Sequence, residues 1–522
     1  MTVLPGYDSI PIPVLDATIS NADILARITL TFPHKLSLSL LEDSFYSLVR
    51  AWPILAARIR PTPSTPSGLS FFVPQPVTLA QLESRSRSTS KPLEQHIVLL
   101  DVSSRSLDTY HAIAGKAVNG QLSRDCISIG LAPDRQEQDK MTCTNACKSF
   151  KELLKADQSF VTAHATLFSD ATVITIAFSH TLGDAFAIKS IFSAWADTLR
   201  TQTPPAALEG LGKDPYREYL PDGRNAVDQE GRELGLPLGW KKFGFVKKIR
   251  LIANLLWDIK IKRPEREFVQ IYIHVPDQKV SELIAEAKAD LAKPSSAKAR
   301  EKERDLNIST FNVLFAFLLQ NIHAANSKPR RKSSVLTIIN AKTRPPAGHK
   351  PTDYPQHQLW GGAIAAPLDK LSSGHYATLP LGQVALHIRE SLRQHIEPDN
   401  LQKMIAKELN HGLWKKPSGK LIFFAGPNDY WFGCTEWRSV KFNEVDFGGG
   451  LQSAVKERGL GEEKEDTRVR PVTIGTHMEI PVTQRNRWVI FGDAGGGVWL
   501  SGGLTMKEAL NQKGFGQYRW VH

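Results

Sequence analysis

The sequence predicts a mixed α/β fold in two halves of similar size, and three observations lead to that prediction. The chain has 522 residues, more than one compact hydrophobic core usually holds. Strand-like and helix-like segments alternate in both halves of the chain. Between the halves, residues 203–237 are rich in Pro, Gly and charge, which indicates a crossover. We therefore expect domains at 1–205 and 266–522, joined by a segment at 206–265.

The first half contains an amphipathic helix, a buried strand and a second helix. Residues 38–60 carry apolar side chains at helical spacing in their first part. Residues 171–179 (ATVITIAFS) are apolar and largely β-branched, which is typical of a buried strand. From Ala185 onward the apolar residues recur with the period of a helix. Residues 180–184 are therefore expected at a strand-to-helix junction.

The second half repeats this alternation. Residues 268–275 and 335–339 read as strands, and 310–322 read as a helix. Near the C-terminus, 488–491 and 498–500 flank a Gly-rich turn, which predicts a hairpin.

Composition restricts the partners and the compartment. The net charge of +12 favours an anionic partner: nucleic acid, an acidic membrane surface or a phosphate-bearing cofactor. No nucleic-acid-binding motif is recognisable. Only four cysteines are present, and none has a His/Cys partner at zinc-finger spacing, so we expect free thiols and no metal. Neither a secretory signal nor an apolar run of membrane-spanning length is visible, so a cytoplasmic monomer is expected.

Three H-x-x-x-D patterns occur, and their contexts differ. His349–Asp353 lies in Pro-rich loop sequence, and His395–Asp399 reads as a helix C-terminus with an exposed histidine. Only His180–Asp184 (HTLGD) follows a buried strand and precedes an amphipathic helix. An imidazole has a pKa near 6.5 and suits a general base that activates a hydroxyl for attack on a thioester. A thioester carries a good leaving group, and the chain has no G-x-S-x-G elbow, so a covalent acyl-enzyme is not expected.

Five ordered stretches resemble the BAHD acyltransferases, particularly their fungal relatives. SHTLGDAF (179–186) resembles the H-x-x-x-D motif of that family, and CTEWRSVKFNEVDFGGG (434–450) resembles T-S-W followed by D-F-G-W-G. The other three resemblances are FYSLVRAWPILAARIR (45–60), NISTFNVLFAFLL (307–319) and the pair IINAKTRPP (338–346) and LWGGAI (359–364). The resemblance implies two domains like chloramphenicol acetyltransferase, each a mixed sheet flanked by helices, with an active-site channel between them.

The resemblance also implies roles for individual residues. His180 would be the general base, and Asp184 would hold the loop, with Arg344 as the candidate partner of its carboxylate. Thr435 and Trp437 would contact the acceptor or the tetrahedral intermediate. Asp184 and Asp446 are counted with His180 among the catalytic candidates. Gly183, Phe447 and Gly448 are expected to be structural, as is Arg344.

The sequence departs from the motifs of the family at three positions. Gly449 stands where D-F-G-W-G has Trp, and Glu436 stands where T-S-W has Ser. Gly362 takes the place of the Asn of F-G-N. These departures bear on the acceptor site more than on the type of reaction.

Residues 241–263 combine an apolar stripe with eight Lys or Arg residues. A basic amphipathic helix can lie on an anionic membrane. The favoured interpretation is a crossover helix that packs its apolar stripe on the core.

The resemblance implies transfer of an acyl group, most simply acetyl from acetyl-CoA, to a hydroxyl of a small secondary metabolite such as a terpenoid or polyketide. An N-acylating or condensation-type enzyme is an alternative, although Ser179 stands where stand-alone condensation domains usually carry a second His. A non-catalytic binding protein of the same fold is the other alternative.

Overall fold

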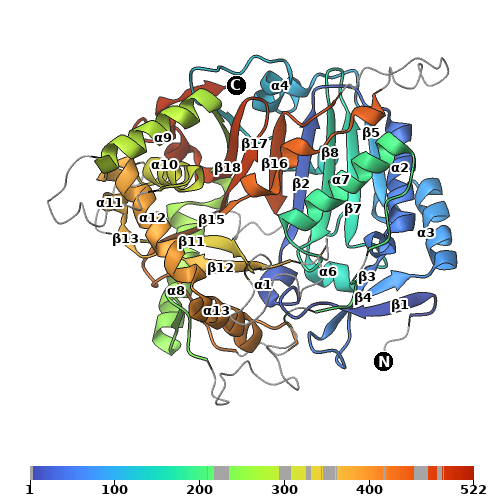
Figure 1. Ribbon diagram of the computed structural model, residues 1–522, viewed down its shortest axis with the longest axis horizontal. Helices are drawn as coiled ribbons and strands as arrows, with labels where there is room; N and C mark the ends of the chain where they lie inside the picture. Colours follow the sequence, from blue (N-terminus) through green and yellow to red (C-terminus); the bar gives the residue numbers. More distant parts are fainter. Residues whose placement is uncertain are drawn as a thin grey trace.

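The computed structural model of the chain describes residues 4–208, 210–214, 216, 234–292, 307–324, 331–341, 344, 359, 361–415, 419–451, 468–478, 485 and 487–522. Two large β-sheets lie beside each other, one in each half of the molecule (Figure 1). Each sheet has its own large cluster of buried hydrophobic side chains and its own covering helices. The predicted mixed α/β class is confirmed.

The first sheet has five strands in the order β16-β2-β8-β7-β5. Their bounds are Thr473–Met478, Leu25–Phe32, Thr172–Ser179, Val161–Leu167 and Ile97–Asp101. Every residue of β8 is buried, which explains its continuous run of apolar and β-branched side chains. The strand predicted at 171–179 is therefore confirmed.

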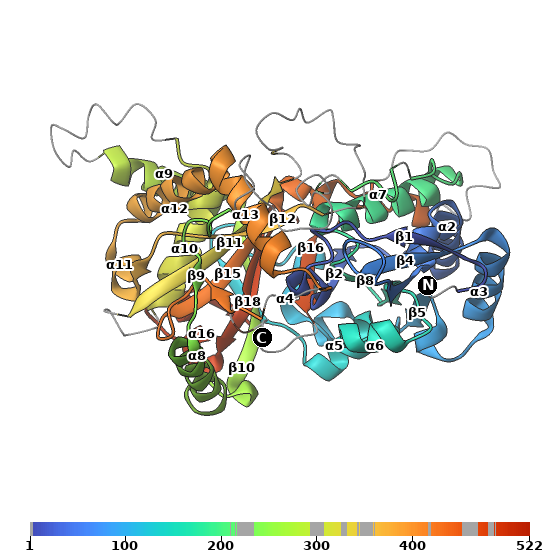
Figure 2. The same cartoon turned by 90° about the horizontal axis from the view of Figure 1, so that it is seen from below.

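Helix α7 (Ala185–Thr201) covers one face of this sheet, and α5 (Arg135–Thr142) lies on the other (Figure 2). Helix α2 (Leu38–Ala51) packs beside α7. Trp195 of α7 is fully buried, and its indole nitrogen donates to the hydroxyl of Ser44 at 2.9 Å. Both predicted helices of the first half are confirmed.

The second sheet runs β12-β11-β15-β17-β18-β10-β6-β19, and a short strand β13 pairs with β11. The bounds in that order, with β13 last, are Ala363–Pro367, Lys332–Asn340, Tyr430–Glu436, Arg487–Asp493, Gly497–Thr505, Phe268–Pro276, Ser128–Leu131, Arg519–Val521 and Leu371–Ser372. β17 and β18 pair antiparallel, which confirms the predicted hairpin.

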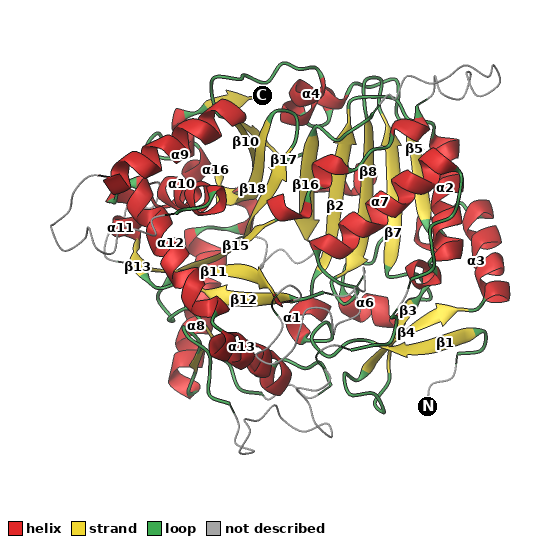
Figure 3. Cartoon of the chain, viewed as in Figure 1, coloured by secondary structure: helices red, strands yellow, loops and turns green. Residues whose placement is uncertain are grey.

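Helices cover the outer side of the second sheet (Figure 3). They are α9 (Asp277–Ala292), α10 (Thr310–Ala324), α11 (Ser373–Thr378), α12 (Leu381–Ile396) and α13 (Pro398–His411). α10 is apolar around most of its circumference because α9, α11 and α12 all contact it.

Smaller elements complete the fold. A three-stranded sheet joins β1 (Tyr7–Pro11), β4 (Leu69–Pro74) and β3 (Arg58–Pro61), and a two-stranded ribbon joins β14 (Ile422–Phe423) to β9 (Lys241–Lys242). The remaining helices are α1 (Ile19–Ala22), α3 (Pro76–Ser88), α4 (Ala112–Val118), α6 (Phe150–Lys155), α8 (Phe245–Trp257) and α16 (Met506–Ala509).

The sheets do not follow the expected sequence boundaries at two places. β6 lies within residues 1–205 but pairs with β10 and β19 of the second sheet. β16 lies within residues 266–522 but pairs antiparallel with β2 of the first sheet. The two halves therefore exchange strands.

Helix α8 departs from the favoured interpretation of residues 241–263. The crossover helix was expected to pack its apolar stripe on the core, yet none of its residues is buried. A π-helical turn, Asp258–Lys262, continues it without buried residues. Within the described residues, no helix has the length and apolar character that crossing a membrane requires.

Candidate active site

A cavity of about 880 Å³ lies between the two sheets. Its wall on the first sheet is formed at the ends of β2 and β8, around Ala26 and Phe178, and at the start of α7. Its wall on the second sheet comes from β11, β12, β15 and β17. Most of the lining is apolar, with a few charged side chains placed among aliphatic and aromatic ones. This volume falls in the range typical of small-molecule sites.

His180 lies on the wall of this cavity, directly after β8. Its backbone N–H donates to the carbonyl of Ile24 at 2.9 Å, which ties the residue to the segment before β2. Burial lowers the pKa of the imidazole, the Asp184 carboxylate opposes this effect, and the Arg487 guanidinium reinforces it. The imidazole is therefore neutral at physiological pH, which is the form that accepts a proton.

Asp184 and Gly183 shape the loop that follows. The carboxylate of Asp184 caps α7 by accepting from the N–H of Phe186 at 3.0 Å. Gly183 has φ +155°, and a Cβ there would lie 2.4 Å from the carbonyl oxygen of Leu359. This close approach explains why Gly occupies the position. The loop therefore depends on backbone from the other half.

Arg344 lines the same cavity as Asp184. Its Nη1 donates to the carbonyl of Asn340 at 2.7 Å. Asp184 is buried whereas Arg344 is exposed. The Arg344–Asp184 pair stays a prediction.

Thr435, Glu436 and Trp437 all line the cavity at the end of β15. The backbone N–H of Trp437 donates to the carbonyl of Ile490 at 2.8 Å. The carboxylate of Glu436 accepts from the N–H of Arg438 at 2.8 Å, and burial raises its pKa. The structure thus brings the T-x-W segment and His180 to one cavity, and Glu436 adds a half-buried acid to its wall.

Arg487 was not singled out from the sequence. It begins β17, lines the cavity and donates to the sulfur of Met478 at 2.8 Å. Burial lowers the pKa of its guanidinium to about 10. An arginine at the start of a strand has no local signature, so only strand pairing could have placed it near His180.

Asp446, Phe447 and Gly448 lie outside the cavity lining. The Asp446 carboxylate accepts from the N–H groups of Gly448 at 2.9 Å and Val469 at 2.8 Å. The ring of Phe447 is fully buried against Phe32 and Trp195, with centroid distances of 5.0 and 5.4 Å. These two hydrogen bonds fit a structural role for Asp446, and its place among the catalytic residues stays a prediction.

The surroundings of Gly449 explain why this chain departs from D-F-G-W-G. A Cβ there would lie 2.6 Å from the Cα of Arg200, at the end of α7. The backbone of α7 occupies the space that a side chain would need.

Of the other two H-x-x-x-D patterns, the one at His395–Asp399 lies within the described residues, and neither of its two residues lines the cavity. His395 was expected to be exposed, which is wrong: it is fully buried, and its Nε2 bonds the carbonyl of Pro367. His395 lies in the last turn of α12, and its side chain points to Pro367 at the end of β12, which accounts for the burial. His349 and Asp353 lie outside the described residues.

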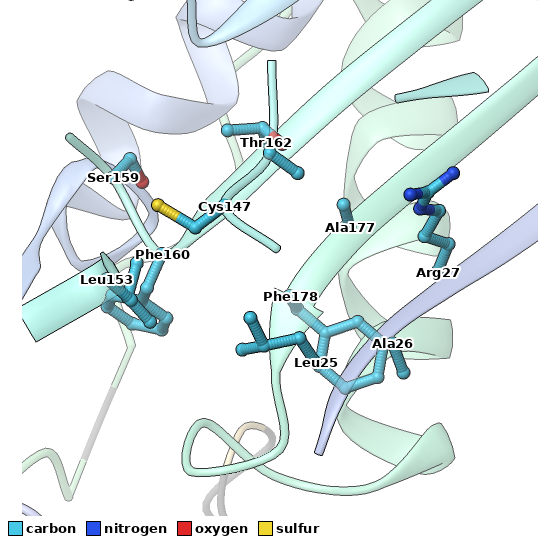
Figure 4. A pocket seen from close by; sticks show the side chains of 11 residues that line it. Leu25, Ala26, Arg27, Cys147, Leu153, Ser159, Phe160, Thr162, Ala177 and Phe178 are labelled. Atoms are coloured by element: carbon cyan, nitrogen blue, oxygen red, sulfur yellow. The ribbon is translucent and has the colours of Figure 1, made fainter. Parts of the chain in front are cut away.

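A second, much smaller pocket lies around Cys147, Ser159 and Phe178 (Figure 4). Its volume of about 20 Å³ suits a single water molecule. Burial raises the pKa of the Cys147 thiol to about 11, so this sulfur is a poor nucleophile.

Comparison with known proteins agrees with this geometry. A sequence model of the Transferase family matches residues 255–472. The acetyltransferase MAT1 of Pseudozyma antarctica is 56% identical over 99% of both chains, and MATC1 of Mycosarcoma maydis is 54% identical over 100% of this chain and 99% of its own. The crystal structure of F. sporotrichioides TRI101 complexed with coenzyme A and T-2 covers 98% of both chains with a TM-score of 0.60 at 14% identity.

The chain belongs to the Transferase family of BAHD-type acyltransferases, and it is an acyl-CoA-dependent acyltransferase. The resemblance drawn from its five motifs is confirmed, and so is the chloramphenicol acetyltransferase-like fold.

Proposed function

We propose that this enzyme transfers an acetyl group from acetyl-CoA to a hydroxyl of a small, largely apolar acceptor, with His180 as general base. The observation that carries the proposal is the position of His180 on the wall of a cavity of about 880 Å³ between the sheets, where burial lowers the pKa of its imidazole. Two relatives that match this chain along nearly their whole length are named acetyltransferases, which supports acetyl as the group transferred.

The chemistry follows from the groups present. The imidazole of His180 takes the proton from the acceptor hydroxyl while the oxygen attacks the thioester carbonyl. The tetrahedral intermediate then collapses, the C–S bond breaks, and the thiolate of CoA receives the proton from the imidazolium. Thr435 and Trp437 line the same cavity and are the residues we assign to the acceptor or the intermediate. No acyl-enzyme is needed, because the thioester itself supplies the leaving group.

The apolar lining favours a hydroxylated acceptor with a large hydrocarbon surface. A terpenoid or a polyketide would satisfy this description, and TRI101 is a neighbour crystallised with T-2 and with deoxynivalenol. The proposed class of acceptor is therefore argued from the apolar lining of the cavity.

The test is release of free CoA thiol from acetyl-CoA in the presence of a panel of hydroxylated apolar acceptors. His180→Ala is expected to lower kcat/KM by about 10²- to 10⁴-fold, the usual contribution of a general base. His375→Ala, at an exposed position of α11, serves as the matched control and is expected to act like wild type. Equal turnover by His180→Ala and wild type would remove the assigned mechanism.

The same panel separates the alternatives. Faster acetylation of amines than of the matching alcohols would favour an N-acyltransferase. Binding of acetyl-CoA without turnover of any acceptor would favour a non-catalytic protein of this fold.

A further inference from the structure

Helix α8 presents its apolar side to solvent. Seven large hydrophobic side chains of α8 and the π-helical turn after it are more than half exposed, and we call them the α8 apolar face: Phe245, Val246, Ile249, Ile252, Leu256, Trp257 and Ile261. Among the described residues, fifteen large hydrophobics are exposed, so nearly half of them gather on this one segment. Single exposed apolar residues are ordinary, but a contiguous patch indicates an interaction surface.

The opposite side of α8 holds the helix to the protein through polar groups. The amide of Asn254 donates to the carbonyl of Pro427 at 2.7 Å and to Asn428 at 2.8 Å. Arg250 also donates to the side chain of Asn428, and Lys248 donates to the carbonyl of Gly419. Lys248, Leu251 and Leu255 are only partly exposed and mark the side of α8 that faces the protein, whereas the α8 apolar face is turned to water. An ordinary surface helix turns its main apolar stripe toward the core instead. The helix lies at the lower edge of the molecule in Figure 2.

Basic side chains surround the α8 apolar face. The exposed ones are Lys241, Lys242, Lys247, Arg250, Lys260 and Lys262. The single acidic residue between 241 and 262, Asp258, is engaged by Arg263 at 2.7 Å, so it does not neutralise the patch. An apolar face flanked by cations matches the chemistry of an anionic lipid surface, with headgroup phosphates around acyl chains. A second copy of this chain would bring two such basic rims together, which is repulsive.

We propose that α8 docks the enzyme on an anionic membrane surface, with the α8 apolar face inserted at the boundary between headgroups and acyl chains. Docking needs no change in the catalytic cavity, because none of the seven residues lines it. Docking would bring the enzyme to the lipid phase, into which a largely apolar acceptor partitions.

Sedimentation with vesicles tests this proposal on the full chain. Wild type is expected to co-sediment with vesicles of phosphatidylcholine and phosphatidylserine at low salt, and much less with phosphatidylcholine alone. Ile249→Ser/Leu256→Ser is expected to weaken binding more than about 100-fold, because two large side chains lose their burial in lipid. Lys247→Gln/Lys260→Gln is expected to weaken binding about 25-fold, since each cation near an anionic leaflet contributes about fivefold.

The matched control is Val77→Ser/Leu93→Ser, which removes two large hydrophobics, 73% and 54% exposed, from another part of the surface. It should bind vesicles like wild type. Wild type that stays in the supernatant, or equal binding by the Ile249→Ser/Leu256→Ser variant, would overturn the proposal. The proposal would also be overturned if light scattering showed that wild type is a dimer and that the Ile249→Ser/Leu256→Ser variant is a monomer. All variants should acetylate a water-soluble acceptor at the wild-type rate, which separates this outcome from a failure of the proposed function.

Discussion

The Cα of Gly183 lies so close to Leu359 that a Cβ would stand 2.4 Å from the carbonyl oxygen of that residue and 2.7 Å from the Cβ of Ala187. The loop bearing His180 is therefore seated on backbone that belongs to the other half of the chain. Gly361, close by, donates its N–H to the buried carboxylate of Asp16 at 3.2 Å. The loop that carries His180 is positioned by this interface as much as by its own strand and helix.

Gly183→Ala should damage both stability and catalysis. The added methyl must displace a backbone carbonyl, which costs about 1–3 kcal/mol. We expect urea unfolding to report that loss in the free energy of unfolding, and kcat/KM to fall because His180 moves with the loop. Gly235→Ala is the control, since a Cβ at Gly235 meets nothing within 4 Å. A Gly183→Ala enzyme as stable and active as wild type would show that the loop is not seated as described.

Arg487 and Asp184 should shift the pH dependence of catalysis in opposite directions. The Arg487 guanidinium lowers the pKa of His180, and the Asp184 carboxylate raises it. Arg487→Met should therefore move the acidic limb of the kcat/KM profile to higher pH, whereas Asp184→Asn should move it to lower pH. Asp184→Asn keeps a helix cap, so its fold should survive. Arg487→Lys keeps the charge and should shift the acidic limb less than Arg487→Met does. If the acidic limb moved in the same direction in Arg487→Met and in Asp184→Asn, this electrostatic account would be refuted.

Gly449→Trp, which restores the D-F-G-W-G pattern, should fail to fold well. The backbone of α7 at Arg200 lies where the side chain would begin. Even Gly449→Ala should lower the free energy of unfolding by about 1–3 kcal/mol. Soluble expression and urea unfolding measure this, with Gly235→Ala again as the comparison. A Gly449→Trp protein as stable as wild type would mean that the end of α7 can move away and make room for the side chain.

Buried histidines should make the enzyme acid-labile. Burial lowers the pKa of His323 to about 3, and its Nε2 lies 2.9 Å from the hydroxyl of Ser333. The unfolded chain takes up a proton near pH 6.5 but the folded protein does not, so stability is full above that pH and falls below it. His323→Gln should remove about 1.4 kcal/mol of the stability difference between pH 7.5 and 5.5. His375→Gln, at an exposed position, should leave the difference unchanged in urea unfolding at the two pH values.

Most of the regular structure was predictable because it is written in local patterns. The periodicity of 171–179 and of the segment after Ala185 predicted β8 and α7, and hence the junction that carries His180. The strand exchange was not predictable in this way. The partner of β16 lies more than 400 residues away, and nothing in Thr473–Met478 specifies which sheet edge it joins.

In the candidate site, too, residues in local motifs were predictable and residues placed by strand pairing were not. Residues within recognisable motifs, His180, Thr435 and Trp437, reach one cavity. Arg487 reaches it only because β17 pairs with β15, a relationship that one sequence does not display. The exposed stripe of α8 misled the expectation for a general reason. An apolar stripe indicates that a face needs a partner, but not whether that partner is the core of the protein.

The position of β16 also bears on how the chain is made. During synthesis, β2 leaves the ribosome about 440 residues before β16 (Thr473–Met478), the strand that pairs with its outer edge. At about 5–20 residues per second, that edge is bare for on the order of a minute. An uncovered strand edge is a template for pairing with other nascent chains. Recombinant yield should therefore respond to growth temperature and to chaperone supply, and a chain truncated before Thr473 should aggregate instead of leaving a folded first half.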